Sequence, residues 1–191
     1  TAQVTDHNDT EVFAQHDGVT LAIDRSELAE LPEVGSDVEG FAYETKQGQA
    51  RLTTKVPTVG RDHYAFAKVV EVRKDLGVFV NIGLPDKDIV VSEDQLPEIS
   101  RLWPQKGDQL MVALTVDKKD RMWGNLADES IIHAVANRAK PEQMNADVTA
   151  TAYRLKMAGT RVLTDDFYLG FIHPSERDAE PRLGQILHAR V

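Results

Sequence analysis

The sequence predicts a mainly β chain of tandem small barrels, with one helix linking two of them and a last barrel that is incomplete. Its apolar stretches are short and recur roughly every 8–12 residues, separated by Gly, Asp, Asn and Pro, a pattern typical of small β barrels and sandwiches. The order of these stretches in the middle of the chain recurs near its end, which indicates repeated modules. A length of 191 residues leaves room for about two or three such domains.

The first part of the chain is expected to form an acidic barrel of its own. The expected elements are a strand at residues 19–23, a short helical turn at 26–30 capped by Ser26, and a hairpin of residues 35–43 and 49–54 around Gln47 and Gly48. Pro57 and Gly60 mark the first boundary, so this domain is expected to cover residues 1–60.

The second part carries the strongest strand signal, because it is rich in β-branched and aromatic residues. Its expected strands cover residues 64–72, 76–82, 88–91, 107–116 and 121–126. The connection between the third and fourth of these strands is the longest one. Five strands with this spacing are the outline of an OB-fold barrel, so residues 61–127 are expected to form one.

One helix and a third module follow. Residues 128–140 are expected to be helical, with Asp128 as the cap and an apolar face made of Ile131, Ile132, Val135, Ala136 and Ala139. Residues 128–146 would then be a helical linker. The expected strands of the third barrel, residues 147–191, are 148–155, 159–163, 168–173 and 184–191, which repeat the order of the second barrel without its closing strand. We therefore expect a truncated barrel and a chain that is a fragment of a longer protein.

Charge and composition exclude several classes of function. The net charge of −9 argues against broad attachment to nucleic acid or anionic membranes. The excess acid is concentrated in residues 1–60, with 11 Asp/Glu against 4 Lys/Arg, whereas residues 61–127 hold 11 against 10 and residues 128–191 hold 9 against 8. A local basic patch is therefore possible in residues 61–191 and improbable in residues 1–60. No apolar run approaches the roughly 20 residues of a membrane helix.

The residues also give no sign of an active site. The chain has no Cys, which excludes disulfides and thiolate metal sites and fits a cytoplasmic location. Its six His are scattered, no glycine-rich phosphate loop is present, and its paired Asp residues lie in expected turns. We therefore expect a non-enzymatic protein with no metal and no cofactor.

The second barrel offers a better signal for binding. The period of two along a strand places Val78 and Val80 inside the barrel and Phe79 on its outer wall, and it places Trp123 outside as well. Cations lie on the same strands and turns, namely Lys68, Arg73, Lys74 and Arg121. Exposed rings among cations suit single-stranded nucleic acid, because rings stack bases while cations meet phosphates. Two alternatives stay open: a neighbouring module or the helix could cover the rings, and the lysines could be solvated turn residues.

Residues 67–82 resemble the opening of the RNA-binding domain named after ribosomal protein S-one, and residues 116–122 resemble its late hairpin. Residues 170–176 are similar to its His-containing strand. The order of the whole chain, above all residues 41–57 and 83–91, resembles the conserved virulence factor B family of bacteria. That resemblance implies an RNA-binding regulatory protein without catalysis, with domains of this type followed by a winged helix.

The chain departs from the family pattern of two aromatics and one His. In the second barrel Phe79 keeps one aromatic, while Leu76 replaces the other and Val91 stands where the His would be. In the third, His173 is kept, while Ala158 and Arg161 occupy the aromatic positions. Each site should therefore be weak, and affinity should depend on linked modules.

These observations lead to one main hypothesis and one rival. The chain is expected to bind single-stranded RNA on its second barrel, with Arg161 and His173 extending the path onto the third. The acidic first domain is expected to contact other proteins, and no membrane is expected as a partner. The rival is a protein-interaction scaffold whose barrels have lost nucleic-acid binding, which the charge of −9 favours.

Overall fold

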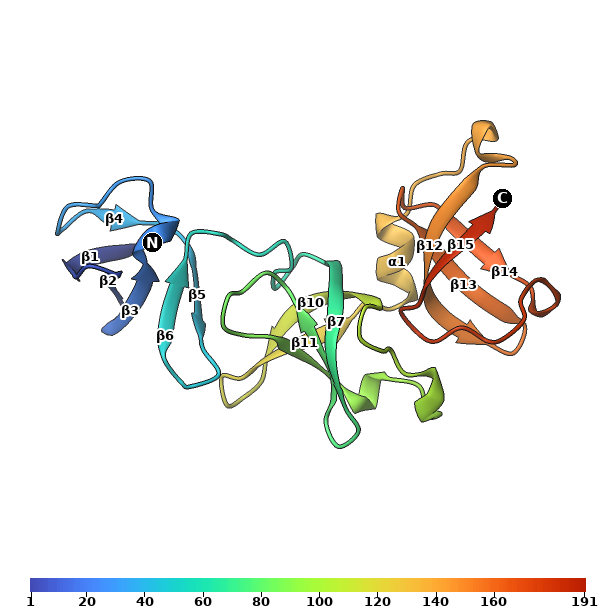
Figure 1. Ribbon diagram of the computed structural model, residues 1–191, viewed down its shortest axis with the longest axis horizontal. Helices are drawn as coiled ribbons and strands as arrows, with labels where there is room; N and C mark the ends of the chain where they lie inside the picture. The colour runs from blue at the N-terminus through green and yellow to red at the C-terminus, as the bar shows by residue number, and fades with distance from the viewer. The chain divides into compact units, whose positions relative to one another are not determined.

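The computed structural model describes residues 1–191 and is mainly β with one α-helix (Figure 1). The predicted fold class is confirmed. The chain divides into two compact units, one made of Thr1–Thr58 and Gly83–Lys87, the other of Val59–Ile82 and Asp88–Val191. None of the helices is long and apolar enough to cross a membrane.

The first unit contains a six-stranded sheet in the order β4-β1-β2-β3-β6-β5. Its strands are β1 (Ala2–His7), β2 (Glu11–His16), β3 (Val19–Asp24), β4 (Asp37–Val38), β5 (Phe41–Glu44) and β6 (Ala50–Thr53). Two corrections concern this unit. Strands β1 and β2 precede the first predicted strand, and the 3-10 turn Arg25–Glu27 is capped by Asp24 instead of Ser26, because the Asp24 carboxylate accepts the Ser26 N–H.

The second unit begins with a closed five-stranded barrel in the order β10-β11-β9-β8-β7. Its strands are β7 (Ala65–Arg73), β8 (Gly77–Asn81), β9 (Ile89–Ser92), β10 (Gln109–Val116) and β11 (Met122–Leu126). Strand β10 pairs antiparallel with β7, and β11 pairs parallel with β9, so the sheet has no free edge. The fully buried interior side chains include Val69, Val78, Val80, Ile89, Val91 and Val112.

The same unit ends in an open four-stranded sheet in the order β14-β13-β12-β15. Its strands are β12 (Asp147–Lys156), β13 (Gly159–Thr164), β14 (Leu169–Ile172) and β15 (Ile186–Arg190). The first three strands pair in the same order as β7, β8 and β9, and both β7 and β12 have a bulge in the same part of the strand. The sheet is therefore a second copy of the barrel pattern, in which β15 takes the place of β10.

The helix α1 (Glu129–Val135) is shorter than predicted. Asp128 caps it as expected, since its carboxylate accepts the Ile131 N–H at 3.0 Å. The predicted extension to residue 140 is wrong, because Ala136 is already extended and the next N–H, that of Asn137, donates to the carbonyl of Phe167. A 3-10 turn, Pro141–Gln143, follows in the linker. The buried Ile132 packs with Met111 of β10 and Leu163 of β13, so the helix fills the junction between the barrel and the open sheet, where it lies against β12 (Figure 1).

Polar contacts also join the barrel to the open sheet. The Arg182 guanidinium donates to both carboxylate oxygens of Asp108, each at 3.0 Å, and the Asp108 side chain is only 8% exposed. The Gln109 N–H donates to the carbonyl of Gly184, and its side chain donates to the Thr151 hydroxyl at 2.6 Å. These contacts lie within the second unit and join its two sheets.

Candidate nucleic-acid interface

A row of side chains crosses the outer wall of the barrel. Phe79 of β8 lies opposite Val90 of β9, and Val90 lies opposite Trp123 of β11. Directly paired residues share a face of a sheet, and all three are half-buried while their neighbours Val78 and Val80 are buried in the interior. Pairing extends the row at both ends, so the outer row consists of Glu71, Phe79, Val90, Trp123 and Thr115.

The Trp123 end of the row has a fixed cation. The Arg121 guanidinium carbon lies 5.6 Å from the centre of the Trp123 ring, a cation–π contact. Asp117 holds this pair in place, since it accepts from Arg121 Nη2 at 2.7 Å and from the indole N–H at 3.2 Å. Hydrogen bonds from the Arg121 backbone and side chain hold the pKa of Asp117 well below its usual range. Arg121 thus presents a planar cation next to the ring.

The other predicted cations flank the row. Lys68 of β7 is exposed and lies opposite residue 81, which shares the outer face with Phe79 two positions along β8. Arg73 lies opposite Gly77 on the other side of Phe79, and its guanidinium is 3.2 Å from Asp75. Lys74 is exposed in the turn that follows. Phe79 therefore has cationic side chains on both sides, and it also has the Glu71 carboxylate within its own row.

The helix packs on a cluster that does not include these rings. The cluster that surrounds Ile132 is formed by Tyr64, Phe66, Met111, Ala127, Val135, Ala136, Tyr153, Leu163 and Phe167. Neither Phe79 nor Trp123 belongs to it. The contacts of the helix in this cluster are therefore made with residues other than the two rings.

The open sheet carries an equivalent row. Arg154 of β12 lies opposite Arg161 of β13, and Arg161 lies opposite Phe171 of β14. The register matches Arg161 with Phe79 and Phe171 with Val90. The aromatic side chain is therefore on the third strand of the open sheet, whereas Phe79 is on the second strand of the barrel. Phe171 is 56% exposed. Sequence reasoning missed Phe171, although its place between Gly170 and the half-buried Ile172 gave the signal of an outward side chain.

Arg161 and His173 are both engaged within the protein. The Arg161 guanidinium donates to the Glu129 carboxylate of α1. His173 caps the 3-10 turn Pro174–Glu176, where its ring accepts the Ser175 N–H at 3.2 Å. The pairing of β8 with β9 and of β13 with β14 makes Ser92 the counterpart of His173, and Ser92 caps a 3-10 turn in the same way. The expectation that the buried Val91 takes that place is corrected.

The structure thus brings the predicted residues of the second barrel to one wall, while Arg161 and His173 lie on the open sheet. OB-type barrels with outward rings and cations define a class of S1-like domains, and comparison with known proteins agrees. The model of an S1 domain matches residues 1–55, that of the CvfB first S1-like domain matches 64–125, and that of the second domain of virulence regulatory factor CvfB matches 132–191. The chain belongs to the conserved virulence factor B family.

Relatives cover nearly the whole chain. Conserved virulence factor B of Staphylococcus epidermidis is 35% identical over 175 residues, which are 90% of this chain and 58% of the relative. The uncharacterized protein YitL of Bacillus subtilis is 41% identical over 172 residues, 90% of this chain and 57% of YitL. A crystal structure from Streptococcus pneumoniae, of a multidomain protein with nucleic acid binding domains, is 51% identical with a TM-score of 0.95 and covers 100% of this chain and 66% of its own. The chain therefore spans less than two thirds of each.

Proposed function

We propose that this chain is the RNA-binding part of a cytoplasmic regulatory protein, which holds single-stranded RNA by base stacking and phosphate contacts and catalyses no reaction. The observation that carries the proposal is the outer row, in which two aromatic rings and a ring-bound guanidinium share one wall of a closed barrel. Rings stack any base, and cations beside them neutralise phosphates, which is how single strands are held on such barrels. The description of the Streptococcus pneumoniae relative supports a nucleic-acid ligand.

Each residue has a proposed role. Phe79 stacks one base, and Trp123 with Arg121 stacks another. Lys68, Arg73 and Lys74 meet the phosphates on either side. Arg161 and His173 continue the RNA path onto the open sheet. The chain is then built of four parts, which cover residues 1–60, 61–127, 128–146 and 147–191. The acidic first domain contacts other proteins.

The binding strength of one such module should be modest. Stacking contributes about 1–3 kcal/mol per base, and the outer row offers few rings. The second unit holds the barrel and the open sheet together through the Asp108–Arg182 pair, so a strand bound on one reaches the other at a high effective concentration. Useful affinity then requires an RNA long enough to contact both.

A pair of matched variants tests the proposal. Phe79→Leu removes a stacking ring but keeps an apolar side chain, so we expect about tenfold weaker binding of short labelled oligouridine by fluorescence anisotropy, with an unchanged melting temperature. Phe13→Leu is the control, because Phe13 follows the β1 bulge and lies opposite Ala22 in the acidic first unit, the same place that Phe79 has in the barrel. Equal affinities for both variants and the wild type would contradict the proposal.

A protein-interaction scaffold is the second candidate. Glu71 in the outer row and the acidic first domain favour it, because carboxylates repel phosphate. The two functions differ in their response to salt. RNA binding should weaken steeply as salt rises, since each phosphate contact at a single strand contributes about −0.7 to the slope of log K against log salt. No binding to RNA at low salt would favour the scaffold.

A further inference from the structure

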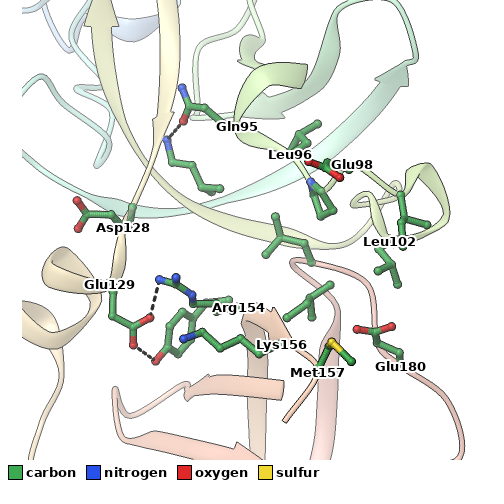
Figure 2. A pocket seen from close by; sticks show the side chains of 17 residues that line it. Gln95, Leu96, Glu98, Leu102, Asp128, Glu129, Arg154, Lys156, Met157 and Glu180 are labelled. Carbon is green, nitrogen blue, oxygen red and sulfur yellow. Dashed lines mark hydrogen bonds and ion pairs between the residues drawn. The ribbon is translucent and has the colours of Figure 1, made fainter. Parts of the chain in front are cut away.

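A single carboxylate in the second unit gathers an unusual number of partners. Glu129, the first residue of α1, accepts hydrogen bonds from the guanidinium groups of Arg161 and Arg154, the latter at 3.0 Å. It also accepts from the Tyr153 hydroxyl at 3.2 Å and lies 3.3 Å from His133 Nε2. Figure 2 shows its carboxylate facing Arg154, with Lys156 reaching into the same hollow. Three donors from strands β12 and β13 thus converge on one anion, with the His133 ring of the helix beside it.

The two arginines need an anion between them. Arg154 and Arg161 are directly paired across β12 and β13, and like charges that face each other across a sheet are unfavourable unless a counter-charge is present. Burial raises the pKa of the Glu129 carboxyl, but the Arg161 and Arg154 charges and the Tyr153 hydroxyl outweigh it and leave that pKa below its usual value. Guanidinium groups bind phosphate in the same bidentate manner as carboxylate. A phosphodiester has the charge and the oxygens to replace Glu129.

The surroundings of the cluster suit a nucleotide. On one side lies a hollow of ≈ 420 Å³ that is lined by Glu129, Arg161 and the exposed Phe171. On the other side lies a hollow of ≈ 550 Å³ with Arg154 and Lys156 in its lining (Figure 2). Glu129 and Tyr153 line both hollows. A strand whose phosphate replaced the Glu129 carboxylate could therefore place a base on Phe171 and its next phosphate toward Lys156.

We propose that Arg154, Arg161 and Tyr153 form a phosphate subsite for single-stranded RNA next to a stacking surface on Phe171, and that Glu129 closes this subsite as an internal competitor. The inference rests on the proposed function and deepens it. In the free protein Glu129 occupies both guanidinium groups. In the complex a phosphodiester oxygen takes its place, so the two arginines change partner without ever lacking an anion. Glu129 thereby weakens the affinity for RNA and limits the number of cations that respond to salt.

Neutralising the competitor should strengthen binding. For Glu129→Gln we expect about three- to tenfold tighter binding of labelled oligouridine and a salt slope that is steeper by about 0.7–1.4, since one or two arginines gain a phosphate. Glu142→Gln is the matched control, because it makes the same change in net charge at an exposed position in the linker turn. Unchanged affinity and slope for Glu129→Gln, or the same gain for both variants, would overturn the inference.

Two further variants keep the test decisive if Glu129→Gln destabilises the junction. Arg161→Gln should weaken binding severalfold in the Glu129→Gln background but much less in the wild type, where Glu129 already neutralises it. Phe171→Leu replaces an exposed ring and should weaken binding about tenfold with no change in melting temperature. Additive effects of the first pair, or no effect of Phe171→Leu, would contradict the subsite.

The design separates failure of the subsite from failure of the proposed function. If Phe79→Leu weakens RNA binding while the Glu129, Arg161 and Phe171 variants do not alter it, the barrel binds RNA and the subsite is wrong. If neither the wild type nor Glu129→Gln binds oligouridine at low salt, both proposals fail. A gain for Glu129→Gln with matched DNA but not with RNA would overturn the assignment of the ligand.

Discussion

Arg121 determines the charge and the shape of the surface at the Trp123 end of the outer row. Its guanidinium lies over the indole ring, and Asp117 holds it there through a short ion pair. Under the proposed function, a base that stacks at this end would contact the planar cation as well as the ring. Guanidinium planes stack bases as aromatic rings do, whereas an ammonium group supplies only charge. The contribution of Arg121 to binding should thus consist of stacking as well as charge.

Arg121→Lys separates these two contributions. The substitution keeps the positive charge, so the salt slope of RNA binding should stay unchanged, whereas the affinity should fall about three- to tenfold because the planar surface is lost. Arg121→Gln should lower the affinity and also reduce the slope by about 0.7. Anisotropy titrations at several salt concentrations measure both quantities. A full recovery of affinity by the Lys variant would show that Arg121 acts only as a charge.

Side chains whose position depends on their own strand could be predicted, whereas those placed by contacts distant in sequence could not. The alternation along one strand was enough to place Phe79 outside and Val78 and Val80 inside the barrel. The Glu129 cluster could not be found this way, because its partner Arg161 is 32 residues away and only the packing of α1 on the sheet brings them together. Phe171 was missed for another reason, since the family pattern expects its aromatics at Ala158 and Arg161 and only a His on the strand of Phe171.

The two sheets of the second unit depend on a glycine at the start of their second strand. Gly77 and Gly159 occupy equivalent places in β8 and β13 and have φ angles of +137° and +148°. An added Cβ would lie 2.0 Å from the Val91 carbonyl oxygen at Gly77 and 2.6 Å from the Ile172 carbonyl oxygen at Gly159. At the start of both strands, the backbone of the next strand, β9 or β14, lies so close that no side chain fits. In the barrel, this close approach lies at the start of β8, the strand that carries Phe79.

Gly77→Ala should therefore destabilise the barrel. The clash is with backbone, which cannot move without loss of β8–β9 pairing, and the φ angle adds strain, so we expect a loss of about 2 kcal/mol or more in the free energy of unfolding by urea denaturation. Gly60→Ala is the control, because its added Cβ would be 3.6 Å from His63 and meets no close backbone. That variant should change stability by less than about 1 kcal/mol. Equal stability of the two variants would contradict this account.

Strands were predicted better than caps and helix ends. The five strands of the barrel have strong β-branched runs, and all five predicted strands are present. Strands β1 and β2 were missed because their apolar content is small: β1 has only Ala2 and Val4, and β2 has only the short run Val12, Phe13 and Ala14. The end of α1 is set by the hydrogen bond from Asn137 to the Phe167 carbonyl, a contact that local propensity does not contain.

The barrel and the open sheet of the second unit, whose outer walls are proposed to bind RNA, are joined by a small set of contacts. Apart from the cluster around Ile132, the junction depends on the bidentate Asp108–Arg182 pair and on backbone hydrogen bonds such as that from Gln109 to Gly184. Linked sites cooperate only when their geometry lets one ligand contact both. The junction is therefore expected to affect long ligands and not short ones.

Asp108→Asn tests this dependence. The Arg182 side chain is only 29% exposed, so loss of its counter-charge leaves a partly buried cation, and we expect about 2–4 kcal/mol less stability for the second unit. A short oligouridine that contacts only the barrel should bind with unchanged affinity, while a longer one should lose most of its advantage over the short one, because the open sheet no longer has a fixed position. Asp147→Asn is the matched control, since its bidentate pair with Arg190 is exposed at 75% and 66% and lies within a single sheet. It should preserve the advantage of the longer RNA. The contrary outcome is an Asp108→Asn variant that is less stable but, below its melting temperature, still binds the longer RNA with the full advantage over the shorter one. The two walls would then bind independently, and the gain for the longer RNA would come only from the covalent link between them.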